Sequence, residues 1–169
     1  VNWSDSVGTA GRIDTAGATN LSVTAIFAID TFELDYSAGK LGSIGGSTSQ
    51  RVDYNSSGSA VTVVANTGYT FAGWNDFSTD NPRQDTLVTA DVDVTAMYTT
   101  NSYRVRYYGN GQDAGTAPVD EDLHNYMTDV TALGSATLEK TGYTFAGWNT
   151  VADGVDGTAY DAGDLVEMP

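Results

Sequence analysis

Hydrophobic and polar side chains alternate along several short segments of the chain. In residues 31–36, TFELDY, every second side chain is apolar and the side chains between them are polar or acidic. A period of two puts successive side chains on opposite faces of a strand, so this pattern predicts a β-strand with one buried face. Glycine-rich turns separate these runs, and only residues 119–127 weakly suggest a short helix. The chain is therefore expected to be mainly β, with at most one short helix per module. Further strands are predicted at 60–65, 91–98 and 102–108.

One nine-residue stretch, TGYTFAGWN, occurs twice, at 67–75 and again at 141–149. Self-similarity of this kind marks a tandem-repeat architecture. A shift of 71 positions also brings VTAIF, near the amino terminus, onto VTAMY, which ends the middle part of the chain. The repeat pattern divides the chain into the carboxy-terminal half of a preceding repeat at 1–29, a complete repeat at 30–99, and a third repeat at 100–169 that stops early.

The charge and the composition narrow the classes of function. The chain carries 22 acidic and 7 basic side chains, a formal net charge of −15 at pH 7, and the acids are spread along its length. Nucleic acids and anionic membranes attract cationic faces, so the acidic balance disfavours these partners. The absence of cysteine excludes disulfide bonds and thiolate chemistry. Since the sequence has no initiator methionine and no segment that reads as a signal peptide or a membrane span, we expect a piece of a longer polypeptide.

The order of motifs in the middle and third units is specific. The third unit carries YRVRYYGNG, GTAPVD, DVTALG, LEKTGYTFAGWNT and ADGVDGTAYDAGD, and it closes with MP. It resembles the internalin B-type B repeat, also called the Listeria–Bacteroides repeat. The middle unit, in which GYTFAGWNDFSTDNPRQDT leads into DVTAMY, resembles the divergent version of that repeat.

This resemblance implies small β-grasp-like modules, found in tandem in large bacterial or archaeal cell-surface and secreted proteins. Such modules serve as stalks, spacers or adhesive segments, and the resemblance carries over no catalytic residue. It also implies that the third unit lacks its last strand, of the type VTLYA. Between the middle and third units we expect a short link near residues 99–102.

Each copy of TGYTFAGWN puts three large aromatic side chains within six residues. A small module has a thin core, so we expect these rings to anchor it. The alternative is that the two tryptophans form an exposed platform on which sugars stack. The predicted core residues are Tyr69, Phe71 and Trp74 in the first copy and Tyr143, Phe145 and Trp148 in the second.

The polar residues that follow the tryptophan also recur. Arg83 and Asp85 correspond to Arg12 and Asp14 at the shift of 71 positions. We interpret them as a structural turn in which the arginine pairs with a carboxylate or stacks on an aromatic ring.

Candidates for catalysis or metal binding are few. The single histidine, His124, stands in an acidic, polar stretch with no nucleophile motif beside it, and we interpret it as solvated. Oxygen-rich loops bind calcium, but the one acidic loop of the third unit has a spacing that fits no EF-hand. No other cofactor is expected. The weak calcium candidates in that loop are Asp153, Asp156, Asp161 and Asp164.

Two functional hypotheses follow. The first is a non-catalytic extracellular structural region, a stalk, spacer, or fibre-forming or adhesive segment, whose partners are neighbouring repeats of the same protein. The second is a binding module for a glycan or a host protein, with or without the help of calcium. A saturable ligand that is lost on mutation of a few loop residues would favour the second hypothesis, whereas an elongated molecule without any ligand would favour the first.

The segment 21–27, LSVTAIF, is a strand of the type that the third unit lacks. An unpaired sheet edge accepts an added strand, so this segment of one chain is predicted to be able to complete the third unit of a neighbour. Such head-to-tail contacts do not close and would grow into a filament. The alternative is that the segment packs on its own chain. The predicted donor side chains are Leu21, Val23, Ala25 and Phe27.

Overall fold

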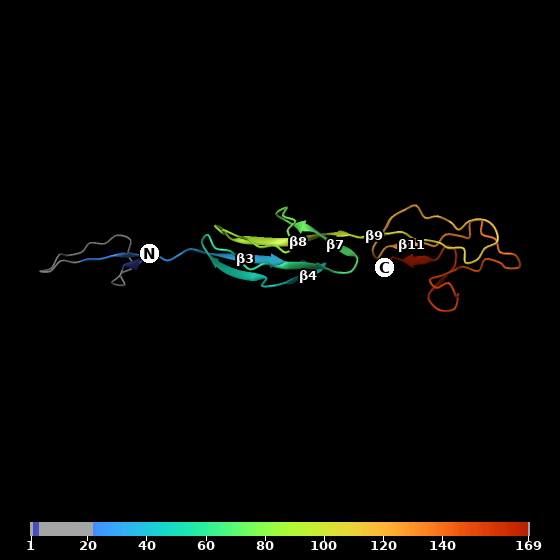
Figure 1. Ribbon diagram of the computed structural model, residues 1–169, viewed down its shortest axis with the longest axis horizontal. Helices are drawn as coiled ribbons and strands as arrows, with labels where there is room; N and C mark the ends of the chain where they lie inside the picture. Colours follow the sequence, from blue (N-terminus) through green and yellow to red (C-terminus); the bar gives the residue numbers. More distant parts are fainter. Residues whose placement is uncertain (1, 4–21, 169) are drawn as a thin grey trace.

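The computed structural model describes residues 2–3 and 22–168, and these residues form short strands and no helix. The predicted mainly β class is therefore confirmed. Three parts follow one another along the long axis of the molecule: a small strand pair, the sheets of the middle unit, and the third unit (Figure 1). The strands are β1 (Asn2–Trp3), β2 (Ala25–Ile26), β3 (Thr31–Ser37), β4 (Gly42–Gly45), β5 (Ser49–Asp53), β6 (Thr62–Ala65), β7 (Tyr69–Trp74), β8 (Val92–Thr100), β9 (Ser102–Tyr103), β10 (His124–Asn125), β11 (Asp129–Thr131), β12 (Trp148–Asn149), β13 (Ala159–Tyr160) and β14 (Leu165–Glu167).

The middle unit is built on a four-stranded sheet in the order β5-β3-β8-β7. The first and last strands of the unit, β3 and β8, lie side by side at its centre and are parallel, with Leu34 opposite Val92. The outer strands β5 and β7 are antiparallel to their neighbours. Parallel neighbours need a long connection. Here that connection also supplies a separate antiparallel pair, β4 with β6.

The alternating pattern of residues 31–36 becomes the two faces of β3. Leu34 and Tyr36 are buried, whereas Glu33 and Asp35 are exposed. Burial of these side chains removes apolar surface from water and is the main force that holds the unit together. The other buried members of this core come from β6, β7, β8 and the turns beside them, and they are Val61, Val63, Trp74, Val88, Val94 and Ala96.

The third unit contains three separate strand pairs, β9 with β10, β11 with β14, and β12 with β13. The strand predicted over 102–108 is shorter than expected, since it is reduced to β9 and one bridge between Arg106 and Val119. In the middle unit the corresponding strand, β3, is held by β8. No strand takes the place of β8 among the described residues of the third unit. Without that neighbour the ladder does not extend.

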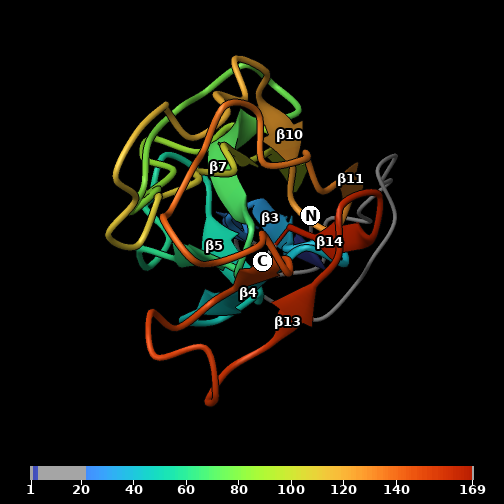
Figure 2. The same cartoon turned by 90° about the vertical axis from the view of Figure 1, so that its right-hand side faces the viewer.

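The helix weakly suggested at 119–127 is wrong. This segment contains β10, in which His124 lies opposite Tyr103 of β9, and the pairing keeps it extended. A turn follows in which Met127 has a positive φ of 57°, which a right-handed helix does not allow. The view along the long axis shows β10 apart from β11 and β14, with the loop before β13 extending away from the rest of the third unit (Figure 2).

The strand pair near the amino terminus repeats a register of the middle unit. Trp3 lies opposite Ala25. At the shift of 71 positions this is the pairing of Trp74 with Ala96 between β7 and β8. It is the backbone pairing that the second half of a repeat would form, and the assignment of 1–29 to such a half stays a prediction.

Candidate functional site

The tryptophan of the first TGYTFAGWN copy lies at the centre of a buried aromatic cluster. Trp74 is 2% exposed, and its indole Nε1 donates a hydrogen bond of 3.0 Å to the carbonyl oxygen of Asp80. The rings of Tyr36 and Phe71 meet it edge-on, at centroid distances of 6.0 and 5.8 Å. A ring buried in this way has no free face for a sugar, so the platform alternative is wrong for Trp74.

A buried arginine connects this ring to two carboxylates. The guanidinium carbon of Arg83 lies 5.4 Å from the ring centroid of Trp74. Its Nε and Nη2 donate to the two carboxylate oxygens of Asp85, each at 2.8 Å, and its Nη1 donates to Asp76 at 2.8 Å. The hydroxyl of Tyr36 also donates to Asp85, at 2.8 Å. The role predicted for Arg83 is pairing with a carboxylate or stacking on a ring, and the structure shows both contacts.

These contacts shift the pKa values of the groups that make them, and that of Arg83 is raised, chiefly by its hydrogen bonds to Asp85. Hydrogen bonds from Arg83 lower the pKa of the Asp85 carboxyl below its usual value, although burial acts in the opposite direction. Burial, together with the hydrogen bond to Asp85, raises the pKa of Tyr36. Asp85 is therefore ionised and Tyr36 is neutral over the physiological range. The repeat counterparts Arg12 and Asp14 lie outside the described residues.

A β-bulge between Phe71 and Gly73 turns the end of β7. Gly73 has a φ of 135°, and a Cβ at this position would come within 2.9 Å of the carbonyl oxygen of Ser78. Both the backbone conformation and the lack of space require glycine. The bulge therefore explains why the motif has alanine and glycine immediately before the buried Trp74.

The other end of the motif forms a joint between the middle and third units, made by Gly68, Tyr69, Thr70, Asn101 and Tyr126. The backbone N–H of Asn101 donates to the carbonyl of Gly68 at 2.8 Å, and the N–H of Tyr126 donates to the carbonyl of Asn101 at 2.9 Å. The hydroxyl of Thr70 donates to the side-chain oxygen of Asn101 at 2.6 Å. The rings of Tyr69 and Tyr126 meet edge-on at 5.7 Å. The Tyr126 ring also lies so close to Gly68 that a Cβ there would overlap it.

The connection through this joint is very short. β8 ends at Thr100 and β9 begins at Ser102, so only Asn101 lies between them. This is where the sequence predicts the link. This single connecting residue is bonded through its N–H, its carbonyl and its side chain.

The second copy of the motif has the same nine residues in different surroundings. Trp148 is half-buried and its Nε1 donates to the carbonyl of Leu133 at 2.7 Å. The ring of Tyr107 lies 4.7 Å from that of Trp148, and the ring of Phe145 lies 5.0 Å from it. Phe145 is 39% exposed and Tyr143 is 74% exposed, so the core role predicted for these two side chains is wrong. The neighbours of the two copies differ: β8 pairs with the first copy, whereas no strand among the described residues pairs with residues 141–147.

One apolar surface was not singled out by the sequence. Phe77, in the turn after the first motif, is 94% exposed and has a φ of 71°. Its N–H donates to the carbonyl of Trp74 at 2.9 Å, which closes the turn. The side chain borders an open groove of 330 Å³ that Met97 also lines. An exposed phenylalanine leaves no periodic signal, so only the structure reveals it.

Comparison with known families decides the assignment. Residues 32–102 match the divergent InlB B-repeat domain, and residues 103–168 match the Listeria-Bacteroides repeat domain. The middle unit therefore belongs to the divergent InlB B-repeat family and the third unit to the Listeria–Bacteroides repeat family. The tandem organisation of the chain and the predicted resemblance are thereby confirmed.

Relatives of this repeat chain include two proteins of Evansella cellulosilytica, each 36% identical to it. One, named as a membrane protein, aligns over 110 residues, or 60% of the chain. The other, named as a Gly-rich membrane protein, aligns over 131 residues, or 69% of the chain. In both cases the chain spans 15% of the relative's length. No solved structure matches the chain. Within the described residues, no helix has the length and apolarity needed to cross a membrane.

The histidine of the Listeria–Bacteroides repeat is not solvated as predicted. His124 is half-buried, and its Nε2 lies 2.8 Å from a carboxylate oxygen of Asp120. The reason is that β10 is held against β9 at Tyr103, which draws the side chain into the unit.

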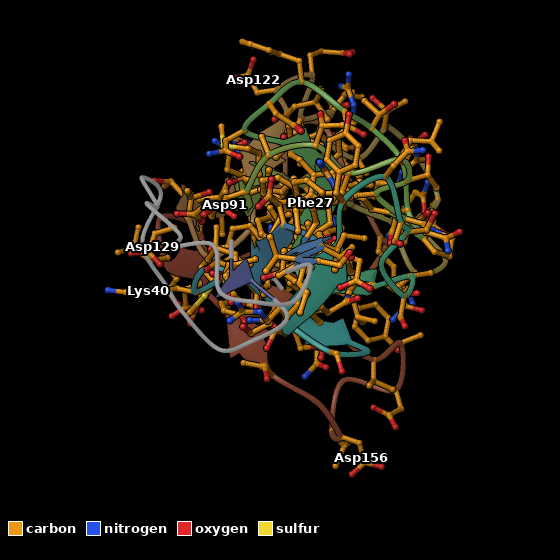
Figure 3. All side chains as sticks on the ribbon, turned by 90° about the vertical axis from the view of Figure 1, so that its left-hand side faces the viewer. Phe27, Lys40, Asp91, Asp122, Asp129 and Asp156 are labelled. Atoms are coloured by element: carbon orange, nitrogen blue, oxygen red, sulfur yellow. The ribbon has the colours of Figure 1, made fainter. Side chains whose placement is uncertain are left out.

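The four carboxylates of the acidic loop do not converge in this repeat. Asp153 accepts from the N–H of Val155 at 2.9 Å, and Asp164 accepts from the N–H of Asp161 at 2.7 Å. Each of these carboxylates therefore closes its own turn, and Asp156 lies at the periphery of the molecule (Figure 3). In the part of the chain that the structure describes, no three histidine or acidic side chains are grouped as metal ligands.

The predicted donor segment pairs within its own chain. Leu21 lies outside the described residues, and Ala25 lies in β2 opposite Trp3 of β1. Val23 and Ala25 are half-buried, whereas Phe27, labelled in Figure 3, is 78% exposed. Donation of this segment to a neighbour stays a prediction.

Proposed function

We propose that the chain is a non-catalytic structural segment, a stalk or spacer on the outside of the cell, in which successive repeats are held in a fixed orientation. The joint at Asn101 carries this proposal. A flexible tether would be joined by an unbonded glycine- and serine-rich linker. Here the connecting residue is one asparagine, bonded on both sides and next to a packed pair of tyrosines.

The composition of the chain and its relatives support the same role. A net charge of −15 makes repeats repel one another and keeps an extended segment from collapsing on its neighbours. Acidic side chains such as Asp122 and Asp156 lie at the periphery (Figure 3). The two relatives named as membrane proteins are several times longer than the chain, as expected if such repeats form one part of a large surface protein.

Small-angle X-ray scattering tests the proposal. The full chain is expected to scatter as a rigid, elongated particle. Tyr126→Ala removes the ring that packs on Tyr69 and should broaden the distribution of particle dimensions. Tyr108→Ala is the matched control, because Tyr108 is 74% exposed and lies in the same unit. If the unchanged chain already scatters as a flexible ensemble, the stalk function is wrong.

A second candidate function rests on the groove beside Phe77. Exposed aromatic side chains at a concave apolar surface are typical of sites that bind another protein. In this case the chain would hold an apolar side chain of a partner protein between Phe77 and Met97. A saturable partner whose binding is lost in Phe77→Ser, and kept in the exposed-loop control Val155→Ser, would establish this function.

A further inference from the structure

We propose that Gly142 and Tyr143 form an open docking site for another repeat unit of this family, joined in line. The part that docks is a turn that carries a tyrosine, here called the tyrosine turn, and it would be held just as Gly68 and Tyr69 hold Tyr126. The inference deepens the proposed stalk function, because it names the partner surface by which an array of repeats continues.

The two sites begin with the same backbone turn. Both glycines have a φ of 82°. The N–H of Tyr69 donates to the carbonyl three residues earlier at 3.1 Å, and that of Tyr143 does so at 3.0 Å. The two copies are identical in sequence from the threonine before the glycine to the asparagine after the tryptophan. The turn that leads into the second site therefore has the shape of the turn that leads into the first.

The occupancy of the two sites differs. Gly68 is buried under Tyr126, whose ring fills the space where a Cβ would stand. No heavy atom of the described residues, apart from the glycine and its chain neighbours, lies within 4 Å of a Cβ built at Gly142. Tyr143 is correspondingly 74% exposed. Among the ring–ring and cation–ring contacts of the described residues, its ring takes part in one, in which Lys140 Nζ lies 5.0 Å from the ring centroid. An exposed glycine and an exposed tyrosine are what an empty copy of the joint would present.

The occupant is defined by the tyrosine turn, and this turn recurs in the chain. In the third unit, the N–H of Tyr126 donates to the carbonyl of Asn101 at 2.9 Å and the next residue, Met127, has a φ of 57°. In the middle unit, the N–H of Tyr54 donates to the carbonyl of Asp30 at 2.8 Å, and Asn55 has a φ of 61°. Each of these two units thus carries a tyrosine turn in its first half and a glycine–tyrosine site in its second half.

The polar groups of the two partners also match. In the joint, Thr70 donates its hydroxyl to the side-chain oxygen of Asn101. Thr144 holds the corresponding position in the second copy and is exposed. The residue at the start of an incoming unit is an asparagine or an aspartate, as Asn101 and Asp30 are, and either one can accept this hydrogen bond. The contact joins two different surfaces, so it can be repeated without closing on itself.

The test adds one more unit in the register that the structure shows. Asn55 donates to the carbonyl of Val88 at 2.7 Å, and Met127 donates to that of Met168 at 2.9 Å, so Met168 corresponds to Val88. A second copy of residues 90–168 should therefore follow Pro169. The readout is the rate at which tetranitromethane nitrates the original Tyr143, as distinct from its copy in the added unit. Peptide mass spectrometry measures this rate on the full chain and on the extended chain.

We expect Tyr143 to react rapidly in the full chain and severalfold more slowly in the extended chain, to the level of Tyr69. Tyr126→Ala in the added unit should restore the rapid reaction, whereas Tyr108→Ala in the added unit should leave Tyr143 protected. An extension by residues 90–100 alone separates the shielding by the added strand from that by the tyrosine. The β-sheet circular dichroism of each extended chain checks that the added unit has folded.

Three outcomes overturn the proposal: no protection of Tyr143 in a folded extended chain, protection that persists without the added Tyr126, or full protection by the strand alone. A concentration-dependent dimer of the unextended chain that Tyr54→Ala abolishes would also overturn it, since a second molecule would then be the occupant. A failure of this kind leaves the joint at Asn101 intact. The stalk function itself fails only if scattering shows that existing joint to be flexible.

Discussion

Arg83 lies over the ring of Trp74, with its guanidinium carbon 5.4 Å from the ring centroid. The contact joins the hydrophobic core of the middle unit to a charged network, because the same guanidinium holds the carboxylates of Asp76 and Asp85. A desolvated cation on an aromatic face is worth about 2 kcal/mol or more. The middle unit is thus held by a core that is part apolar and part ionic, in a chain with no disulfide bond.

The two tryptophans should contribute unequally to stability. Trp74→Ala removes a side chain that is 2% exposed and should lower the free energy of unfolding of the middle unit by about 3–5 kcal/mol. Trp148→Ala removes the half-buried ring and should lower that of the third unit by less, because part of the ring is already in water. Urea unfolding followed by circular dichroism measures both losses. Equal losses would show that Trp148 is as buried in solution as Trp74.

Removing one partner of the Arg83 ion pair should lower the free energy of unfolding of the middle unit. Asp85→Asn leaves a nearly buried guanidinium with its bidentate partner removed, and such changes cost about 3–5 kcal/mol. Asp35→Asn is the control, because Asp35 is exposed on the other face of β3 and surface changes stay within about 0.5 kcal/mol. Thermal unfolding at neutral pH gives both values. If the two variants unfold alike, the network adds no stability.

How far the sequence predicts this structure depends on the neighbours of each strand. Alternation correctly places β3, β6 and β8, because their partners lie within the middle unit. The same reasoning fails at Tyr143 and Phe145, which have the sequence of Tyr69 and Phe71 but, within the described part of the chain, neither a paired strand like β8 nor a ring in the place of Tyr126. A nine-residue pattern determines the local turn, as the equal φ of Gly68 and Gly142 shows. It cannot determine burial, because burial depends on residues far away in the chain.

The candidate site was predicted in part for a similar reason. The pairing of Arg83 is readable because arginine and aspartate recur at a fixed distance from the tryptophan. The role of Tyr126 is not readable, since it belongs to a turn 58 positions beyond Gly68 with no matching pattern between them. Exposed side chains such as Phe77 likewise obey no period, so the surface had to come from the structure.

The stability of the middle unit should fall in acid through Asp85. The folded pKa of this carboxyl lies below its ordinary value of 3.8, so the unfolded chain takes up the proton at a higher pH than the folded chain does. The stabilisation is fully present above the ordinary value and is lost as the pH falls from about 4 through the folded pKa. Melting temperatures measured across this range should fall more steeply for the unchanged chain than for Asp85→Asn. Parallel slopes would show that other carboxyls dominate the acid transition.

The two equivalent glycines should respond differently to the same change. Alanine at 68 or at 142 costs about 1 kcal/mol for the left-handed backbone conformation that both positions share. Only at 68 does the added Cβ also overlap the ring of Tyr126. Gly68→Ala should therefore lower the melting temperature more than Gly142→Ala and loosen the joint in scattering experiments. If the two variants match in both measurements, Tyr126 does not pack on Gly68 in solution.

The register of Trp3 with Ala25 bears on whether the amino-terminal segment is donated to a neighbouring molecule. It equals the register of Trp74 with Ala96. In a donated arrangement, β2 would pair in this register with the strand of Trp148 in a neighbouring molecule. That edge of β2 is already occupied by β1. Donation therefore requires that β1 be displaced. We expect the full chain to be monomeric in multi-angle light scattering, and deletion of residues 1–29 to leave it so. A mass that grows with concentration in the full chain, and does not in the deleted chain, would instead establish strand donation and head-to-tail growth.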